Sequence, residues 1–277
     1  MPELPEIETV KLGIEKTVLG SVIISTKLFR RDLRFPVKEN LEKSILNRRV
    51  LGVGRRSKYL LFFLNKKTTL VLHLGMSGKI DVSIKSENEY KAKKHDHLII
   101  SFDSGFLLIY NDPRRFGFVE IIEGDHTNYQ RFKNLGIEPL SKKFNGKYLW
   151  LKIKSSSRTL KNILMDQKVV AGLGNIYVSE ALWDSRIKPT RVGKNMSLTD
   201  SNKLVVSIKK VLDKAIKFGG TTLKDFRQVG GEVGYFQNKL QVYGKEGQAC
   251  FRRKCKGTVE KTIISGRSTF YCSTCQK

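Results

Sequence analysis

The chain has 277 residues, of which 40% are hydrophobic, so it can bury a sizeable core and form two domains. Its 52 Lys and Arg residues outnumber its 26 Asp and Glu residues and give a formal net charge of +26. This charge disfavours an enzyme of small metabolites and favours a polyanionic partner, most commonly nucleic acid. A ribosomal protein, a membrane-surface protein or a general lysine bias would also explain it.

The apolar runs are much shorter than the roughly 18 residues of a membrane-spanning helix. The acidic start also lacks the basic and apolar regions of a signal peptide. We therefore expect no membrane partner and a cytoplasmic location, close to the DNA of a cell without compartments.

Residues 5–19 carry Ile7, Val10, Ile14 and Val18 at a spacing of three to four, which predicts a helix. From residue 21 to 122, short apolar and β-branched runs alternate with turn residues, a pattern typical of a β-sandwich or a barrel. Seven strands are predicted, at residues 22–28, 50–56, 59–64, 69–74, 98–102, 106–110 and 116–122.

After residue 140 the pattern becomes helical. Serines at residues 155–157 are expected to cap a helix that runs to about residue 167, and further helices are predicted at 176–186 and 199–218. Residues 221–247 predict a long loop with one short helix, and such loops are usually either functional or disordered. Residues 258–271 predict a hairpin.

All four cysteines lie near the end of the chain, with the spacing Cys250-x4-Cys255-x16-Cys272-x2-Cys275. Two short pairs separated by a longer span are typical of a structural zinc site. Disulfides are the alternative, but they are disfavoured without a secretory signal. We therefore expect one Zn²⁺ per chain, held by these four residues.

The N-terminus can carry a nucleophile. A small residue such as Pro2 normally allows removal of Met1, which leaves a secondary amine. An α-amine titrates near pH 8, well below a lysine, so more of it is free base at neutral pH. Its attack on an aldehyde-level carbon gives an iminium that draws in electrons. By itself, however, Pro2 is more typical of a residue that only starts a helix.

Seven motifs, in order along the chain, resemble the formamidopyrimidine-DNA glycosylase family. They are PELPEIETV at residues 2–10, KYL at 58–60, HLGMSG at 73–78, NDPRRFG at 111–117, GLGNIY at 172–177, GGTTLKDF at 219–226 and RSTFYCSTCQ at 267–276. Each motif is weak alone, but together they cover the whole chain.

The resemblance implies an α+β fold. It would comprise an N-terminal helix plus β-sandwich catalytic domain (residues 1–135), a hinge (136–150), a helix–two-turn–helix domain (151–247) with a lesion-covering loop (about 224–237), and a β-hairpin zinc finger (248–277). The implied activity is removal of oxidised purines, such as 8-oxoguanine and formamidopyrimidines, from double-stranded DNA in base excision repair. A bacterial, monomeric glycosylase and abasic-site lyase is expected.

The resemblance also implies catalytic roles. Pro2 would attack C1′, expel the base and form a Schiff base, after which β,δ-elimination cuts the strand. Glu3 would move protons, although a carboxylate there also suits a helix start. Lys58 would contact DNA beside the lesion, although most strand-end lysines are simply solvated.

Further residues would hold DNA with its damaged base flipped out. Met76, Arg114 and Phe116 match three residues that fill the hole and hold the orphan cytosine, although a lone methionine is often core. Asn175 would bind phosphate at a helix start, where asparagine also serves as a cap. Arg267 lies in the predicted hairpin and matches the family arginine that grips the same backbone region. Lys224 opens the lesion-covering loop. His73, Lys94 and His95 are weaker candidates for phosphate contact, and ordinary surface placement is the alternative for them.

The first cysteine pair departs from the family, whose usual spacing there is Cys-x2-Cys. The four intervening residues either lengthen the knuckle or add a phosphate contact. Two other functions remain open. One is an endonuclease VIII-like glycosylase for oxidised pyrimidines, a branch that typically has Gly in place of Leu4. The other is a non-catalytic zinc-finger DNA-binding protein.

Overall fold

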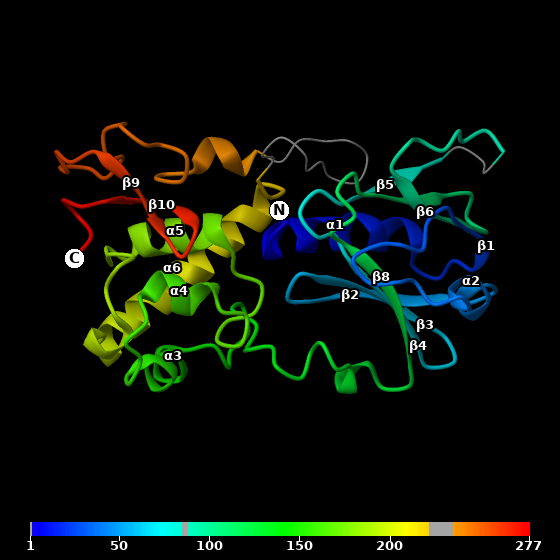
Figure 1. The fold of residues 1–277 in the computed structure, drawn as a ribbon, viewed down its shortest axis with the longest axis horizontal. Coiled ribbons are helices and arrows are strands. Elements are labelled where there is room, and N and C mark those ends of the chain that lie inside the picture. Colours follow the sequence, from blue (N-terminus) through cyan, green and yellow to red (C-terminus); the bar gives the residue numbers. More distant parts are fainter. Residues whose placement is uncertain (1, 85–87, 222–234) are drawn as a thin grey trace. The chain divides into compact units, whose positions relative to one another are not determined.

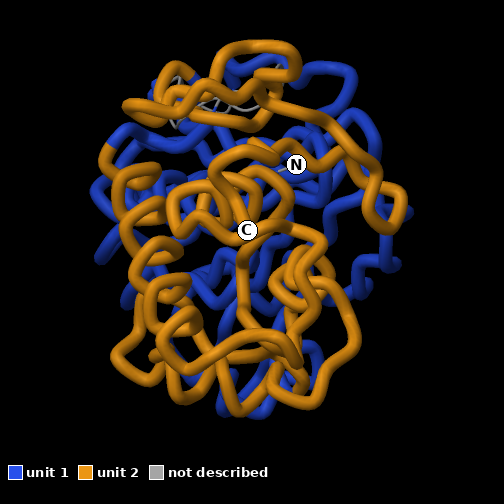
Figure 2. The backbone as a smooth tube through the Cα atoms, turned by 90° about the vertical axis from the view of Figure 1, so that its left-hand side faces the viewer, with its two compact units in different colours: residues 1–133, 218–237 blue, residues 134–217, 238–277 orange. Residues whose placement is uncertain are grey.

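The computed structural model describes residues 2–84, 88–221 and 235–277 (Figure 1). The chain divides into two compact units: residues 1–133 with 218–237, and residues 134–217 with 238–277 (Figure 2). The predicted four-part division of the chain stays a prediction. No helix in the described ranges is both long and apolar enough to cross a membrane.

The first unit begins with α1 (Leu4–Val18), whose first turn starts at Glu3 and whose apolar face is buried. Two antiparallel sheets follow, with strand orders β1-β6-β7-β5 and β2-β3-β4-β8. Their bounds are β1 Ile23–Leu28, β2 Val50–Arg56, β3 Tyr59–Leu64, β4 Thr68–His73, β5 Lys79–Ser83, β6 Asp96–Phe102, β7 Leu107–Asn111 and β8 Phe118–Glu123. The short helices α2 (Leu41–Ile45) and η1 (His126–Asn128) lie in the connections.

One hydrophobic core joins α1 to both sheets. It contains Ile7, Val10, Ile14 and Val18 of the helix together with inward-facing residues of the strands. The described strands form two separate sheets rather than one closed barrel, so the β-sandwich expectation is confirmed and the barrel alternative is wrong. All seven predicted strands are present; β5 and α2 are additional elements.

The second unit is helical and ends in a two-stranded hairpin. Its elements are α3 Gly146–Ile153, α4 Leu160–Met165, α5 Asn175–Asp184, η2 Gly193–Asn195, α6 Leu198–Lys217, η3 Phe236–Lys239, β9 Val259–Ile264 and β10 Arg267–Cys272. Helix α6 packs against α3 and α5, and β10 packs against α5. The predicted cap at residues 155–157 is wrong: Thr159 caps α4, because its hydroxyl accepts the N–H of Asn162.

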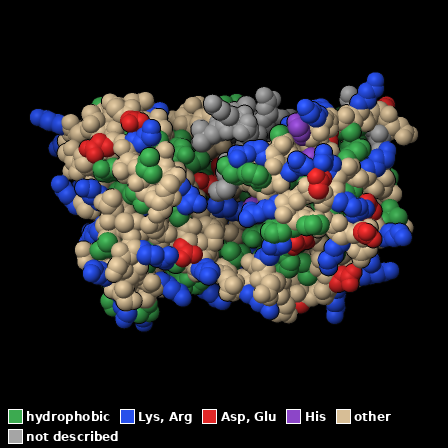
Figure 3. Space-filling view, in the orientation of Figure 1, with side chains coloured by type: hydrophobic (Ala, Val, Ile, Leu, Met, Phe, Trp, Pro, Cys, Tyr) green, Lys and Arg blue, Asp and Glu red, His purple; other side chains and the backbone are tan. Residues whose placement is uncertain are grey.

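The charge excess is visible on the surface. Lysine and arginine side chains are spread over the face of both units in Figure 3, and acidic side chains are fewer. Such a surface attracts a polyanion over a wide area and so favours nucleic-acid binding without defining its location.

Candidate active site and nucleic-acid interface

The N-terminal end of α1 is buried and fixed by hydrogen bonds. Pro2 and Glu3 are both buried. The Glu3 N–H donates to the Glu6 carboxylate over 2.8 Å, and the other oxygen of that carboxylate accepts the Thr221 N–H, also over 2.8 Å. Glu6 therefore joins the start of the chain to a residue more than two hundred positions away, a link that no local pattern predicts.

Lys58 lies in the turn between β2 and β3 and is only 8% exposed. Ser57 before it has φ of 54°, the left-handed geometry of a tight hairpin. Arg55 fixes the turn against α1, since its guanidinium donates to Glu8 over 2.6 Å and to the carbonyl of Ser57 over 2.9 Å. The predicted lysine is therefore held on the side of the sandwich that carries α1, and is not a freely solvated side chain.

Two loops bring the three predicted insertion residues together in the first unit. Met76 is 41% exposed and Phe116 is 43% exposed, so neither is core. The Arg114 guanidinium lies over the Phe116 ring, 4.5 Å from its centroid. The loops touch at Gly75, where a Cβ would lie 2.4 Å from the carbonyl carbon of Phe116. Gly75 also has φ of 61°, so glycine is required there on both grounds.

The buried carboxylate of Asp112 anchors both loops. One of its oxygens accepts the Ser77 hydroxyl over 2.6 Å, and the other accepts the Gly117 N–H over 2.8 Å. Tyr110 donates to Asp112 over 3.2 Å. Sequence reasoning missed this residue, although an acidic residue directly after a fully buried strand was an available signal.

A cavity of about 740 Å³ opens beside these loops. Its lining combines aromatic, sulfur-containing and cationic side chains, and comprises Asp32, Arg34, His73, Gly75, Met76, Arg114, Arg115 and Phe116. Such a mixture can stack on a base and hydrogen-bond its edge. Three of the residues predicted for DNA insertion and one predicted phosphate contact therefore share one concave surface.

His73 is held as a neutral imidazole. Its ring stacks on Phe118 at a centroid distance of 5.3 Å, and its Nδ1 accepts the Gly75 N–H over 3.1 Å. Burial, aided by the nearby Lys58 cation, lowers the pKa of His73 to about 4. At neutral pH it can therefore offer a neutral Nε2–H donor to a phosphate. His95 is half-buried, and its carbonyl accepts the Asp112 N–H over 3.0 Å.

In the second unit, Asn175 is the first residue of α5, and the residue at the cap position is Gly174. The helix-cap alternative for Asn175 is therefore wrong. Its Nδ2 donates instead to the carbonyl of Ser268 on β10, over 2.8 Å. Arg267 precedes Ser268 and is exposed. The helix start and the hairpin arginine thus lie next to each other, as a shared phosphate contact requires.

Two buried charged residues that sequence reasoning missed support α5. Lys161 is 1% exposed and donates to the Ser179 hydroxyl over 2.9 Å and to the Asn175 carbonyl over 3.2 Å. The Glu180 carboxylate accepts three consecutive N–H groups, from Gln241 to Tyr243, at 2.9 to 3.0 Å. Burial raises the pKa of Glu180. Both residues lie among apolar residues of their helices. Their sequence positions therefore did not indicate which groups they bind.

The four cysteines form one cluster. Their sulfur atoms lie within 4.8 Å of one another, and none is in a disulfide. The Cys250–Cys275 and Cys255–Cys272 sulfur pairs are 3.8 and 3.7 Å apart. Four sulfurs about 2.3 Å from a tetrahedral ion would stand about 3.8 Å apart. The cluster therefore fits a metal site, and the long first knuckle does not prevent this arrangement.

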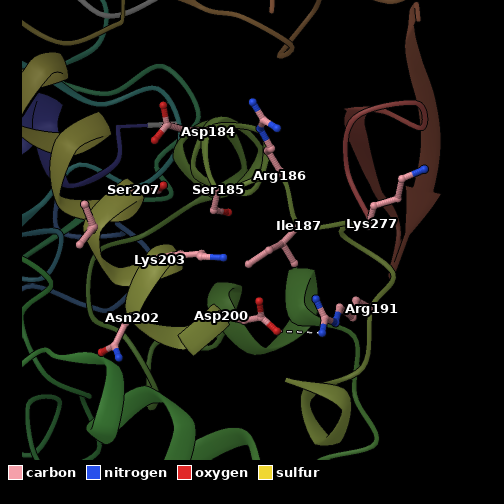
Figure 4. A pocket seen from close by; sticks show the side chains of 11 residues that line it. Asp184, Ser185, Arg186, Ile187, Arg191, Asp200, Asn202, Lys203, Ser207 and Lys277 are labelled. Atoms are coloured by element: carbon pink, nitrogen blue, oxygen red, sulfur yellow. Dashed lines mark hydrogen bonds and ion pairs between the residues drawn. The ribbon is translucent and has the colours of Figure 1, made fainter. Parts of the chain in front are cut away.

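A second cavity, of about 730 Å³, lies at the C-terminal end of α5, where Asp184 and Ser185 line it (Figure 4). The Arg191–Asp200 ion pair, 2.9 Å long, is drawn at its edge. None of the residues predicted for catalysis, DNA contact or metal binding lines this cavity. Lys224 and the loop up to residue 234 lie outside the described residues.

The first unit is a β-sandwich with a buried glutamate at its N-terminal helix, and the second is a helical unit that ends in a four-cysteine hairpin. On a chain with a net charge of +26, these features are typical of a nucleic-acid-binding protein. Residues 1–119 match the formamidopyrimidine-DNA glycosylase N-terminal domain, and residues 135–227 match the H2TH domain of the same family. The chain belongs to the formamidopyrimidine-DNA glycosylase family.

Individual relatives are similar over the whole chain. The formamidopyrimidine-DNA glycosylase of Zymomonas mobilis is 42% identical, with all of both chains covered. That of Rickettsia massiliae is 45% identical, with all of this chain and 97% of the relative covered. The Lactococcus lactis enzyme in complex with DNA containing an abasic site has a TM-score of 0.89 and 36% identity over 99% of each chain. MutM in complex with DNA containing carbocyclic 8-oxoguanine has a TM-score of 0.89 and 37% identity over all of both chains.

Proposed function

We propose that this chain is a glycosylase of base excision repair that removes oxidised purines from double-stranded DNA and then cleaves the abasic strand as a lyase. The observation that carries this proposal is the likeness, over the full chain, to glycosylases solved with abasic or 8-oxoguanine DNA. It works as a monomer in the cytoplasm, where bacterial DNA lies.

Pro2 is the nucleophile of the proposed reaction. Its free amine forms a bond to C1′ while the bond from C1′ to the base breaks, and the departing base takes up the proton that the amine loses. Glu3 protonates the ring oxygen, so the sugar opens and a C1′ iminium forms. The iminium draws in electrons as neighbouring C–H bonds lose protons, and the phosphates on either side leave in turn. The buried position of both residues at the start of α1 supports these roles.

The remaining predicted residues bind the DNA. Met76, Arg114 and Phe116 fill the space of the flipped base and contact the orphan cytosine, a role supported by their exposure beside one cavity. His73, His95, Asn175 and Arg267 contact phosphates. Lys58 contacts DNA beside the lesion, and Lys224 belongs to the loop over the lesion. Phosphates suit a helix start such as that of α5, where the helix dipole favours an anion, and the exposed arginine beside it.

The cysteine cluster holds one Zn²⁺ through Cys250, Cys255, Cys272 and Cys275. A closed set of four thiolates leaves no position for a substrate, so the ion stabilises the hairpin and takes no part in the reaction. The spacing of the sulfur atoms supports this assignment.

A comparison of substrates tests the proposal. Purified protein is mixed with duplexes that carry one 8-oxoguanine opposite cytosine, one thymine glycol, or no lesion. We expect base release and strand cleavage that are fastest on 8-oxoguanine. Preference for thymine glycol would favour the endonuclease VIII-like branch. Tight binding with no cleavage of any lesion or abasic duplex would favour a non-catalytic DNA-binding protein.

A further inference from the structure

The knuckle between Cys250 and Cys255 carries one residue that turns inward. Arg252 is half-buried, whereas Phe251, Arg253 and Lys254 are exposed. The Arg252 guanidinium donates to the carbonyl oxygens of Trp183 and Asp184, over 2.5 and 3.4 Å. These are the last two residues of α5, where helix carbonyls lack partners within the helix and the helix dipole favours a cation.

Trp183 connects this contact to the cysteine cluster. The Arg252 guanidinium lies over its indole ring, 4.5 Å from the ring centroid. The indole N–H donates to the sulfur of Cys250 over 3.4 Å. The same ring packs in a buried cluster with Val242, Phe270 and Cys272. An indole nitrogen can only donate, so its natural partner here is a thiolate that accepts.

The hairpin is also attached at the other end of α5. Asn175, the first residue of that helix, donates to the carbonyl of Ser268 on β10. Strand β10 lies beside α5 in Figure 1, and the two elements are in contact. The hairpin and its cysteine cluster are therefore attached to both ends of α5. The Asn175 side chain binds them at the start of the helix, and the Trp183–Arg252 pair binds them at its end.

We propose that Trp183 and Arg252 are positioning residues of the metal site, which retain the ion by holding Cys250. Arg252 fixes the indole against the end of α5, and the indole N–H stabilises the Cys250 thiolate as a ligand. This inference rests on the zinc site proposed above. It gives the long knuckle a role inside the protein, distinct from the phosphate contact that its basic residues also suggested.

Zinc release from the intact, zinc-loaded protein tests the inference. The rate of transfer to a chromogenic chelator is measured without DNA for the wild type and for Arg252→Ala, Trp183→Phe and Arg253→Ala. Because partners of metal ligands typically change metal affinity about 10- to 100-fold, we expect Arg252→Ala and Trp183→Phe to release zinc at least about 10-fold faster. Arg253→Ala removes the same charge from the same knuckle, so it should stay close to the wild-type rate.

A spectroscopic measurement separates the N–H···S hydrogen bond from a general loss of packing. In cobalt-substituted protein, loss of a donor to Cys250 raises the energy of the sulfur lone pairs. Trp183→Phe, which keeps an aromatic ring, should therefore move the sulfur-to-cobalt charge-transfer band to longer wavelength. Arg253→Ala should leave the band unchanged. If Arg252→Ala does not fold, Arg252→Lys serves in its place, because it keeps the charge but loses the planar stack.

The outcomes distinguish this inference from the zinc proposal. One zinc per chain, with equal release rates for Arg252→Ala and Arg253→Ala and an unshifted band in Trp183→Phe, would overturn the positioning role alone. Wild-type protein that binds no zinc would overturn both. Faster release from Arg252→Ala and Trp183→Phe, with the shifted band, would support the inference.

Discussion

The backbone N–H of Thr221 donates to the side chain of Glu6 over 2.8 Å. Thr221 immediately precedes residues 222–234, and the other oxygen of Glu6 accepts the N–H of Glu3. The buried Glu6 carboxylate therefore connects the start of α1, beside the proposed nucleophile, to Thr221. Thr221 lies just before the segment that the family resemblance assigns to the lesion-covering loop.

The first prediction concerns this carboxylate. In Glu6→Gln, the amide replaces one acceptor oxygen with a donor, which removes the hydrogen bond from Glu6 to one buried N–H. The cost should be about 1–3 kcal/mol of local stability. Hydrogen exchange at Glu3 and Thr221 should accelerate accordingly, by about 5-fold to about 150-fold.

A matched control lies on the same helix. Glu15 forms an ion pair with Lys11 at 2.9 Å and is 32% exposed. Glu15→Gln should change exchange at Glu3 and Thr221 very little, because exposed ion pairs contribute little. Equal protection in the wild type and Glu6→Gln would contradict the role of Glu6.

The second prediction concerns the insertion loops. Asp112 accepts hydrogen bonds from both loops, so Asp112→Asn should loosen Met76 and Phe116 together. Stopped-flow fluorescence of a 2-aminopurine beside the lesion monitors the rate of base flipping. We expect the same kinetic phase to slow in Asp112→Asn and in Phe116→Ala. Zinc content should not change in either variant.

Asp125→Asn is the control for this series, since Asp125 only caps the exposed η1. Flipping at the wild-type rate in Phe116→Ala would count against the wedge role. A normal rate in Asp112→Asn alone would leave the wedge intact and remove the anchoring role of Asp112.

The third prediction is a titration. The pKa of His73 is about 4 in the folded protein, below the value of about 6.5 expected for an unfolded chain. As the pH falls from 6.5 to 4, the unfolded chain binds this proton first, so His73 removes stability over that range. NMR of the four histidines, with His73→Asn for assignment, should show one imidazole that titrates near 4.

The same titration of His73 is repeated in the complex with DNA. A phosphate near His73 should raise its pKa, because an anion stabilises the charged imidazolium. A His73 signal that titrates near 6.5 in the free protein would contradict its half-buried, neutral state. An unchanged pKa in the complex would remove His73 from the phosphate contacts.

The fourth prediction concerns the cysteines. Elemental analysis should find one zinc per chain, and the four thiols should react slowly with a disulfide reagent until a strong chelator is added. Cys272→Ser should lose zinc, since Cys272 is fully buried in the finger cluster. Rapid reaction of all four thiols in the untreated wild-type protein would contradict the metal site.

Much of the fold was predictable because its signals are local. Helix α1 follows a spacing of three to four residues, and strand β3 is a short, continuous apolar run. Strand β5 was missed because it lies at the edge of its sheet and only Ile80 is fully buried. Helix α3 was missed because it starts at Gly146, a residue that usually marks a break.

The contacts that organise the site were not predictable, because they join residues far apart in the chain. Glu6 meets Thr221, Ser77 meets Asp112, and Trp183 meets Cys250. Sequence motifs identified Met76 and Phe116 as candidates, but only the structure shows that Gly75 allows their loops to touch. Long-range contacts of this kind depend on tertiary packing, and no periodic sequence pattern indicates them.

Borohydride trapping tests the central claim most directly. Protein is mixed with a labelled duplex that carries 8-oxoguanine opposite cytosine, reduced, digested and mapped by mass spectrometry, with Pro2→Gly as the comparison. We predict a covalent DNA adduct on the amine of Pro2, absence of Met1, and no adduct or base release in Pro2→Gly. An adduct on a lysine, or intact base release by Pro2→Gly, would contradict the proposed chemistry.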